Sequence, residues 1–304
     1  MIGADASRHA GFTLVELVVV IVVSGVLAAV AASFISRPIQ GAVEQDARAA
    51  LVDQADLALR RVAREIHRGL PNSVRVQPVS GPYNRLEIIR IAEGASYRSR
   101  PGSGGSGTAY NQPQYRLNVH TADDSFNVLG SLTNDFGGSS GRRIAIYPTD
   151  ADTVYQDAET VDSDPTQESV ITPADRSGFG ISANNSSEET RVQFSAGFDF
   201  RYDSPQQRLY VTDTPVSFVC DSASRELLMY WAYPIRSSQP TQSDLEGSLG
   251  ASRTVLARNV DRCQFTYVPG APQRAGLVTL DLGLSTQRAG VVRLLHQVHV
   301  VNTP

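Results

Sequence analysis

Lysine is absent from this chain of 304 residues, and all 27 Lys/Arg positions are arginine. The Gly/Ser-rich stretch 101–107 therefore cannot be a phosphate-binding loop of the Gly-Lys-Ser/Thr type, and we interpret it as a flexible loop. The formal net charge is −4. Since the arginines are scattered, the chain lacks the basic patch of a nucleic-acid-binding protein, and we expect no nucleic-acid partner.

The sequence also lacks recognisable catalytic and metal-binding motifs. It contains no Gly-x-Ser-x-Gly elbow and no Cys-x-x-Cys pair. His296 and His299 lie three residues apart in a strand-like run, so their side chains point to opposite faces and cannot share a metal. His67 is typical of the surface of an amphipathic helix, and His120 has only two aspartates nearby in a predicted loop. We therefore expect no enzyme activity, no metal and no cofactor.

One stretch near the start has almost no polar side chains. It contains no charged residue between Leu17 and Ala32, and the apolar run continues to Ile35. Counted from Phe12 it has about 24 residues, enough to cross a bilayer at ~20 apolar residues per span. Glu16 is the exception. A charge at membrane depth costs roughly 3 kcal/mol or more, so this carboxylate needs a partner or a function.

The residues at the start of this run form a recognisable signal. The sequence Gly-Phe-Thr-Leu-Val-Glu-Leu at 11–17 resembles the class III signal of type IV pilins and type II secretion pseudopilins. The resemblance implies that a prepilin peptidase cuts after Gly11, that the new N-terminus, Phe12, is N-methylated, and that Glu16 pairs with the amino terminus of a neighbouring subunit. It also implies that the partners are other pilins and minor pilins, the prepilin peptidase, and the pilus assembly platform in the inner membrane.

Physical chemistry agrees with this assignment. A free amino group and a carboxylate are each costly in an apolar environment, and two identical staggered helices would satisfy both charges. Two other interpretations compete. A secretory signal peptide cut near 29–31 would have a hydrophobic region of ~7–15 residues, shorter than this one and without Glu16. A plain membrane anchor does not explain a glutamate so close to Gly11 and Phe12. We therefore assign 1–11 as a leader peptide and 12–36 as a helix in the membrane or fibre core.

Helical character continues over residues 37–70. Apolar side chains recur there every three or four residues, which predicts one stripe along a helix that packs on a globular domain. We expect Pro38 to kink the helix, and Gly69 and Pro71 to end it. The stripe consists of Ile39, Val43, Ala47, Leu51, Ala55, Ala58, Val62, Ile66 and Leu70.

Residues 71–304 are predicted to form a β-rich ectodomain, since short runs rich in Val, Ile, Phe, Tyr and Leu alternate with turn residues. The expected fold class is α+β: a long N-terminal hydrophobic and then amphipathic helix, packed on an antiparallel β-sheet in a pilin-like layout. The polar, acidic stretch 147–175 is predicted to be a solvated loop, with calcium binding by its carboxylates at 150–164 as the alternative. Strands are expected at 73–76, 86–91, 115–119, 126–129, 142–147, 190–194, 197–202, 208–212, 216–220, 227–233, 254–260, 263–268, 276–284 and 291–301.

Further segments resemble one subfamily, the minor pilin-like proteins of the mannose-sensitive haemagglutinin (MSHA) type IV pilus system. The resemblance implies a single-pass protein of the inner membrane with a periplasmic ectodomain, which could also enter an extracellular pilus. An even number of cysteines in an exported chain favours a disulfide between Cys220 and Cys263, with two buried free thiols as the alternative. The similar segments are 37–39, 55–61, 70–75, 214–221, 263–267 and 296–300.

The favoured function is that of a minor pilin-like structural subunit that helps to initiate or stabilise an MSHA-type pilus. A type II secretion pseudopilin is the nearest alternative within the same structural class. The other class is a ligand-binding or adhesin ectodomain displayed on the fibre, which would need an exposed aromatic or basic cleft. Trp231 with Tyr230 and Tyr233 forms the only dense aromatic cluster, and its alternation indicates packing within a sheet first.

Overall fold

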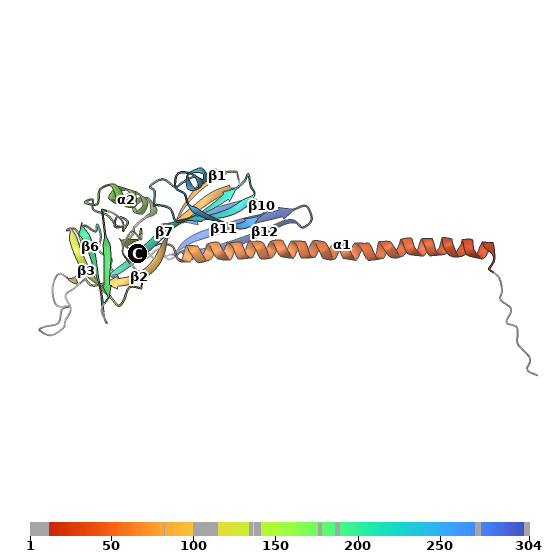
Figure 1. Ribbon diagram of the computed structural model, residues 1–304, viewed down its shortest axis with the longest axis horizontal. Coiled ribbons are helices and arrows are strands. Elements are labelled where there is room, and N and C mark those ends of the chain that lie inside the picture. The colour runs from red at the N-terminus through yellow and green to blue at the C-terminus, as the bar shows by residue number, and fades with distance from the viewer. Residues whose placement is uncertain are drawn as a thin grey trace, which may run out of the picture.

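The computed structural model describes residues 12–81, 83–99, 115–133, 136, 141–175, 178–185, 189–270 and 275–300. The predicted α+β class is confirmed: helix α1 (Leu14–His67) projects as a long rod from a β-rich body (Figure 1). The other elements are β1 (Arg75–Ser80), β2 (Tyr83–Tyr97), β3 (Asp123–Leu129), β4 (Arg143–Ile146), α2 (Ala151–Ser163), β5 (Ile181–Asn185), β6 (Glu189–Phe198), β7 (Arg208–Asp221), β8 (Glu226–Trp231), α3 (Gln242–Glu246), β9 (Ser252–Arg258), β10 (Val260–Val268), β11 (Gly276–Thr286) and β12 (Gly290–Val300).

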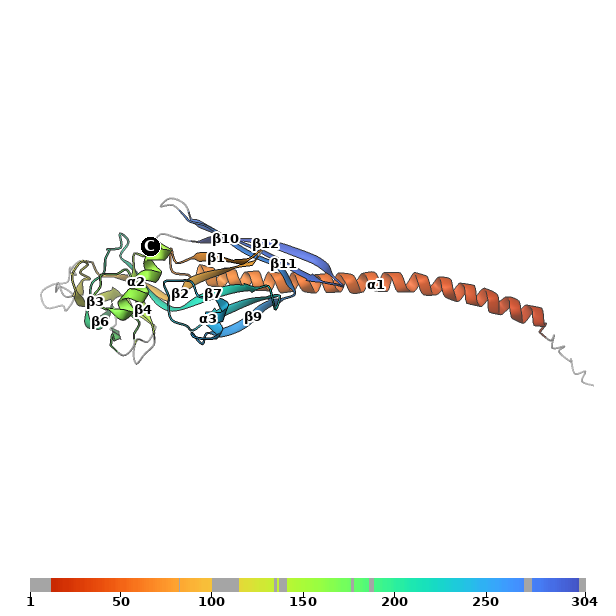
Figure 2. The same ribbon diagram turned by 90° about the horizontal axis from the view of Figure 1, so that it is seen from above.

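Helix α1 joins the apolar segment and the amphipathic segment without a break. It continues through Pro38, and both views draw it as one gently curved rod (Figures 1 and 2). It ends at His67, one residue beyond Ile66, the last buried stripe residue within the helix, and the N–H of Arg68 donates to the carbonyl oxygen of Glu65 (2.9 Å). The predicted apolar stripe is buried in the second half of the helix, at Leu51, Ala55, Ala58, Val62 and Ile66.

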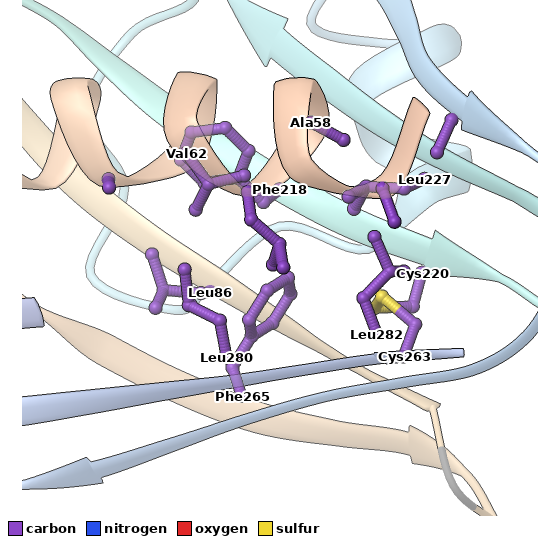
Figure 3. Packing of buried hydrophobic residues seen from close by; sticks show 14 of the residues in the cluster. Ala58, Val62, Leu86, Phe218, Cys220, Leu227, Cys263, Phe265, Leu280 and Leu282 are labelled. Carbon is purple, nitrogen blue, oxygen red and sulfur yellow. A yellow bond between two sulfur atoms is a disulfide. The ribbon is translucent and has the colours of Figure 1, made fainter. Parts of the chain in front are cut away.

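A curved antiparallel sheet wraps around this stripe. Figure 2 shows α1 between the strands β10–β12 on one side and β7 and β9 on the other, and the helix contacts β12, β11 and β9. In the core, Ala58 and Val62 of α1 lie close to Phe218 and Leu280 of the sheet (Figure 3). Fully burying a side chain of this size contributes roughly 1.5–3 kcal/mol, so this packing orients the ectodomain on the helix.

The three strands β10–β12 are joined to the rest of the sheet by a small set of contacts. Strand β10 pairs with β2 in parallel at Cys263 and Tyr83. One residue further, the side-chain amide of Asn84 donates to the carbonyl oxygen of Phe265 (2.6 Å) and accepts from its N–H (2.7 Å), as a backbone partner would. The predicted disulfide is confirmed beside this junction, where Cys220 and Cys263 are bonded with a Cα–Cα distance of 5.7 Å.

The strands β2 and β7 are long enough to build a second lobe beyond the end of α1. Their far ends pair with each other and with β3 and β4, and β3 continues to β6 and β5. Two predicted strands, 208–212 and 216–220, are in fact the single strand β7 with an irregular register near Asp213. The second lobe has its own core of aromatic rings, which includes Phe126, Phe179, Phe194, Phe198 and Phe200.

Two predictions for the middle of the chain were wrong. Residues 115–119 form no strand; instead the N–H of Leu117 bonds to the carbonyl oxygen of Arg98 in a connection. The stretch 147–175 is not only a loop, because it contains α2. The Asp150 side chain caps this helix by accepting from the N–H of Thr153 (2.8 Å). The stretch is acidic, but its buried residues recur at helical spacing: Val154, Tyr155, Ala158 and Val161.

The junction at Asn84 makes a testable prediction. Replacing it with alanine leaves the buried N–H and carbonyl of Phe265 without these partners, so Asn84→Ala should lower the free energy of unfolding by about 3 kcal/mol. The measurement is urea unfolding of the full chain in detergent micelles, followed by the fluorescence of Trp231. The matched control is Asn184→Ala, since Asn184 is exposed and its side chain donates to the side chain of Gln193 on the neighbouring strand (3.0 Å). Equal stability of the two variants would contradict the role of Asn84.

Candidate functional site: an exposed apolar helix and its first-turn carboxylate

The first half of α1 presents apolar side chains all round. Residues Leu14–Ala32 have a mean hydropathy of 2.8, and none of this stretch is buried by the rest of the protein. Within the described part of the chain, it is the one helix long and apolar enough to cross a membrane. Leu14 is 78% exposed and Ile21 is 62% exposed. Apolar surface of this extent must be covered by lipid or by other protein.

The start of α1 carries the residues singled out in the sequence. Phe12 and Thr13 precede the helix, and Thr13 is its N-cap: its hydroxyl oxygen accepts from the N–H of Glu16 (3.3 Å). The side chain of Glu16 does not complete a capping box. It is exposed and forms no ion pair with another described residue. Gly11 lies outside the described residues, so the structure contains only one side of the predicted cleavage junction.

In this geometry the Glu16 carboxylate is exposed in the first turn of the helix. Thr13 satisfies the backbone at the helix start, so the carboxylate is not needed there as a cap. The positive end of the helix dipole favours a negative charge in the first turn. In a lipid or protein environment, however, the charge would still require a partner.

Comparison with known proteins identifies the type of segment. Residues 6–32 match the family model described as the prokaryotic N-terminal methylation motif. The match supports a type IV pilin-like protein. No curated protein and no solved structure matches the chain. Together with the apolar helix, the motif fits a membrane-anchored protein with a single span, and it suggests processing by a prepilin peptidase and assembly with other pilins.

The histidines of the ectodomain lie in separate places. His296 of β12 pairs across from Leu280 and is half-buried, whereas His299 pairs across from Leu277 and is exposed, so the prediction of opposite faces agrees with the register. His120 contacts Glu168 at 3.3 Å, with both side chains exposed. Among the described residues, no three side chains of the types His, Cys, Asp and Glu come together where they could hold a metal ion.

The carboxylates of the stretch 150–164 serve the structure around α2. Asp157 and Asp162 form ion pairs with Arg201 and Arg143, respectively. Glu159 accepts from the N–H of Ser237 (3.0 Å). These carboxylates are spread along a helix and bound by the protein itself, whereas a calcium site needs several oxygens converging on one point. The geometry therefore gives no support to the calcium alternative.

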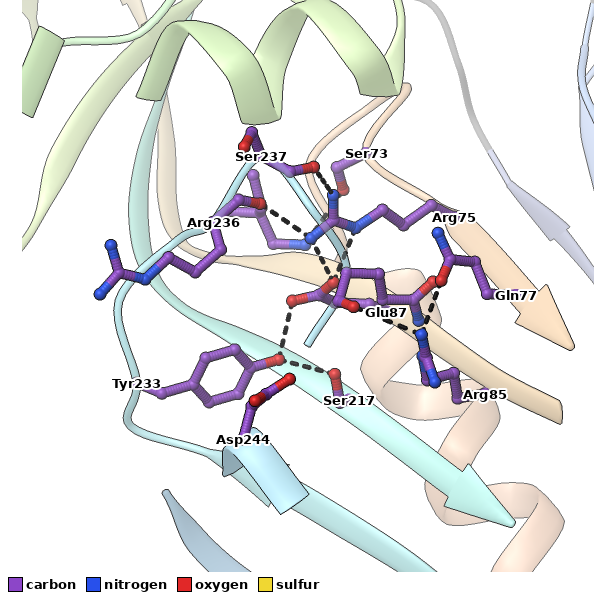
Figure 4. Close-up of polar contacts among 12 residues, drawn as sticks. Ser73, Arg75, Gln77, Arg85, Glu87, Ser217, Tyr233, Arg236, Ser237 and Asp244 are labelled. Atoms are coloured by element: carbon purple, nitrogen blue, oxygen red, sulfur yellow. Dashed lines mark hydrogen bonds and ion pairs between the residues drawn. The ribbon is translucent and has the colours of Figure 1, made fainter. Parts of the chain in front are cut away.

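A buried polar network crosses the sheet near α2. Glu87 is fully buried and accepts from Arg75 (2.7 Å) and from the hydroxyl of Tyr233 (2.9 Å), which Ser217 contacts in turn at 2.7 Å (Figure 4). The guanidinium of Arg75 lies 3.5 Å from the centre of the Tyr155 ring. Burial raises the pKa of Glu87, and the interactions with Arg75 and Tyr233 oppose this rise.

Sequence reasoning missed this network because its members are far apart along the chain. Glu87 is fully buried, and both of its carboxylate oxygens accept hydrogen bonds from within the protein. The network therefore has a structural role. Its effect is to hold Tyr233 in place.

A second charged group lies on the outer face of the sheet β10–β12. Asp281 of β11 accepts from Arg262 of β10 (2.6 Å) and from Arg293 of β12 (2.7 Å), so one carboxylate ties three strands together. Burial alone would raise the pKa of Asp281, but the hydrogen bonds from Arg293 and Arg262 outweigh burial, and the pKa lies below its ordinary value.

This lowered pKa predicts how stability depends on pH. Because the folded state favours the ionised form of Asp281, its contribution is present at neutral pH and is lost as the pH falls through the folded-state pKa. Asp281→Asn should lower the free energy of unfolding by about 1 kcal/mol at pH 7, a small value because both arginines are partly exposed. The difference from the unchanged chain should shrink below about pH 4.

Urea unfolding of the full chain at several pH values measures this difference. The control is Asp53→Asn, on the exposed face of α1. A pH-independent effect of Asp281→Asn would show that the three-strand contact does not depend on ionisation.

Proposed function

We propose that this chain is a minor pilin-like subunit that helps to initiate or stabilise a type IV pilus of the MSHA type, similar to MshO. The observation that carries the proposal is the exposed apolar helix whose first turn holds a carboxylate, Glu16, that forms no ion pair with a described residue. A soluble enzyme has no use for such a helix, whereas a subunit that moves from a membrane into a fibre needs one surface that fits both environments.

In this proposal the prepilin peptidase removes residues 1–11, and the new amino group of Phe12 is methylated. The amino group of one subunit then pairs with Glu16 of its neighbour. Four residues separate the two positions, so the neighbour is displaced by roughly 6 Å or more along the helix axis. Each pairing neutralises two charges that would be costly to bury separately.

The size of the ectodomain favours a minor subunit over a subunit that repeats along the whole fibre. It consists of two lobes on one helix (Figure 1), and a body of this size is difficult to repeat at every step of a thin fibre. The Cys220–Cys263 disulfide fits an ectodomain in the oxidising periplasm. The proposed partners are other pilins and minor pilins, together with the assembly platform of the inner membrane.

A type II secretion pseudopilin is the second candidate, because the same helix and carboxylate would serve a short secretion fibre. Deleting the gene separates the two: loss of surface pili with normal protein secretion supports the pilus subunit, and the reverse supports the pseudopilin.

The proposed processing predicts a defined mature chain. The intact mass of the membrane-derived protein should correspond to a chain that begins at Phe12 and carries one added methyl group. Inactivating the prepilin peptidase should leave residues 1–11 attached. A mature chain that begins after Ala31 would indicate a secretory signal peptide instead.

The assembly contact predicts a separation between folding and fibre formation. Glu16→Ala should leave cleavage at Gly11 and ectodomain stability unchanged, because Glu16 lies far from the ectodomain core along α1. Incorporation into sheared surface fibres should fall at least several-fold, since the amino group of a neighbour loses its partner. Immunoblots of processing and of sheared fibres measure both effects. The matched control is Glu44→Ala, an exposed carboxylate of α1 outside the apolar segment; equal incorporation of both variants would refute the contact.

A further inference from the structure

A cleft of about 550 Å³ lies between the two lobes, on strands that both lobes share. Its lining includes Arg90 of β2, Asp213 and Pro215 of β7, Trp231 at the end of β8, and Tyr233 and Ile235 in the following connection. The volume is in the range of small-molecule sites, which are typically apolar pockets of roughly 300–1,000 Å³ with a few well-placed polar groups. The cleft is remote from the exposed half of α1, so the assembly function leaves it unexplained.

The walls of the cleft combine an aromatic face with apolar side chains. Trp231 is half-buried, and its indole N–H has no hydrogen-bond partner among the described residues. Trp231 is also the only tryptophan in the chain. Indole offers a broad apolar face and one polar atom, and the N–H of a tryptophan in a protein usually finds a partner.

Two arginines line the cleft, and each is paired with carboxylates: Arg143 with Asp162, and Arg90 with Asp213 and, at 4.0 Å, with Glu65. Arg90 donates to the oxygen Oδ2 of Asp213 through Nε (3.0 Å) and through a second guanidinium nitrogen. The other oxygen of Asp213, Oδ1, accepts no hydrogen bond from a described residue, and this side chain is 40% exposed. Because the charge of each arginine is balanced by a carboxylate, the site favours an uncharged ligand. It still presents donors and an acceptor side by side.

The cleft is held in shape by the surrounding contacts. Ala232 adopts φ = 60°, a left-handed conformation that is unusual for a residue other than glycine. The hydroxyl oxygen of Thr214 stabilises it by accepting from the N–H groups of Ala232 (2.9 Å) and Tyr233 (3.3 Å). Tyr233 is anchored in turn by Glu87 (Figure 4). Strained backbone and irregular strand register often mark binding sites, because the surrounding structure holds them in place.

We propose that this cleft binds a neutral saccharide. A sugar ring has an apolar C–H face that can stack on Trp231, and its hydroxyl groups both donate and accept, which matches Asp213 Oδ1 and the guanidinium of Arg90. Phosphorylated or otherwise anionic ligands fit less well, since the charge of Arg90 is already neutralised. The proposal adds a ligand-binding activity to the structural subunit and does not depend on how that subunit assembles.

The single tryptophan provides a direct test. The full chain is purified in a detergent without a sugar headgroup and titrated with glucose, galactose, N-acetylglucosamine and their disaccharides, while tryptophan fluorescence is recorded. A saturable change is expected for at least one saccharide. Asp213→Asn should weaken that affinity about tenfold, the effect of losing roughly one good hydrogen bond.

Two further variants complete the test. Tyr202→Ala removes an exposed aromatic side chain outside the cleft and should bind as the unchanged chain does. Trp231→Ala should lose binding when it is followed by saturation-transfer NMR of the saccharide, with its fold checked by circular dichroism. The proposal is overturned if no saccharide gives a saturable response, if Asp213→Asn binds with unchanged affinity, or if only anionic compounds or peptides respond.

Discussion

The structure depends on one packing interaction, the burial of the apolar stripe of α1 by the curved sheet. The sheet buries this stripe only in the second half of the helix, from Leu51 to Ile66. The first half keeps its apolar surface exposed, so one continuous helix is covered by the sheet along its second half only. The same helix that carries the exposed apolar segment therefore also orients the β-rich body.

The sheet can wrap around the helix because it is built from two parts that meet at an angle. Strands β10–β12 lie on one side of α1, and β7 and β9 lie on the other (Figure 2). At the junction, backbone pairing between β10 and β2 is limited to Cys263 and Tyr83, and it is supplemented by the side-chain amide of Asn84 and by the Cys220–Cys263 bond. Side-chain bonds permit a change of strand direction that a regular ladder would resist, while they still satisfy the backbone groups of β10.

The long strands β2 and β7 connect the second lobe to the core around α1. Strand β2 runs from the core around α1 to the aromatic core of the far lobe, and the antiparallel strand β7 runs from the far lobe back to the core around α1. Where they pass between the cores, their register is irregular and the Trp231 cleft opens. The cleft therefore lies on strands shared by both lobes and apart from the exposed half of α1.

The sequence by itself determined the features that depend on local order. The signal at 11–17, the uncharged run, the stripe of α1, most strand positions and the one possible cysteine pair are all visible in it, because each is encoded by residues at short or regular spacing. Glu16 was recognised in the same way, from its position in a short motif.

Only the tertiary structure decided the features that depend on distant partners. Helix α2 was missed because its four buried apolar residues are interspersed with acidic and other polar residues. The helix is stabilised by the burial of these four residues against the rest of the ectodomain. The network of Arg75, Glu87 and Tyr233 and the cleft at Trp231 join residues separated by more than a hundred positions. No local pattern specifies such contacts, since they exist only once the long strands and the helix have been packed together.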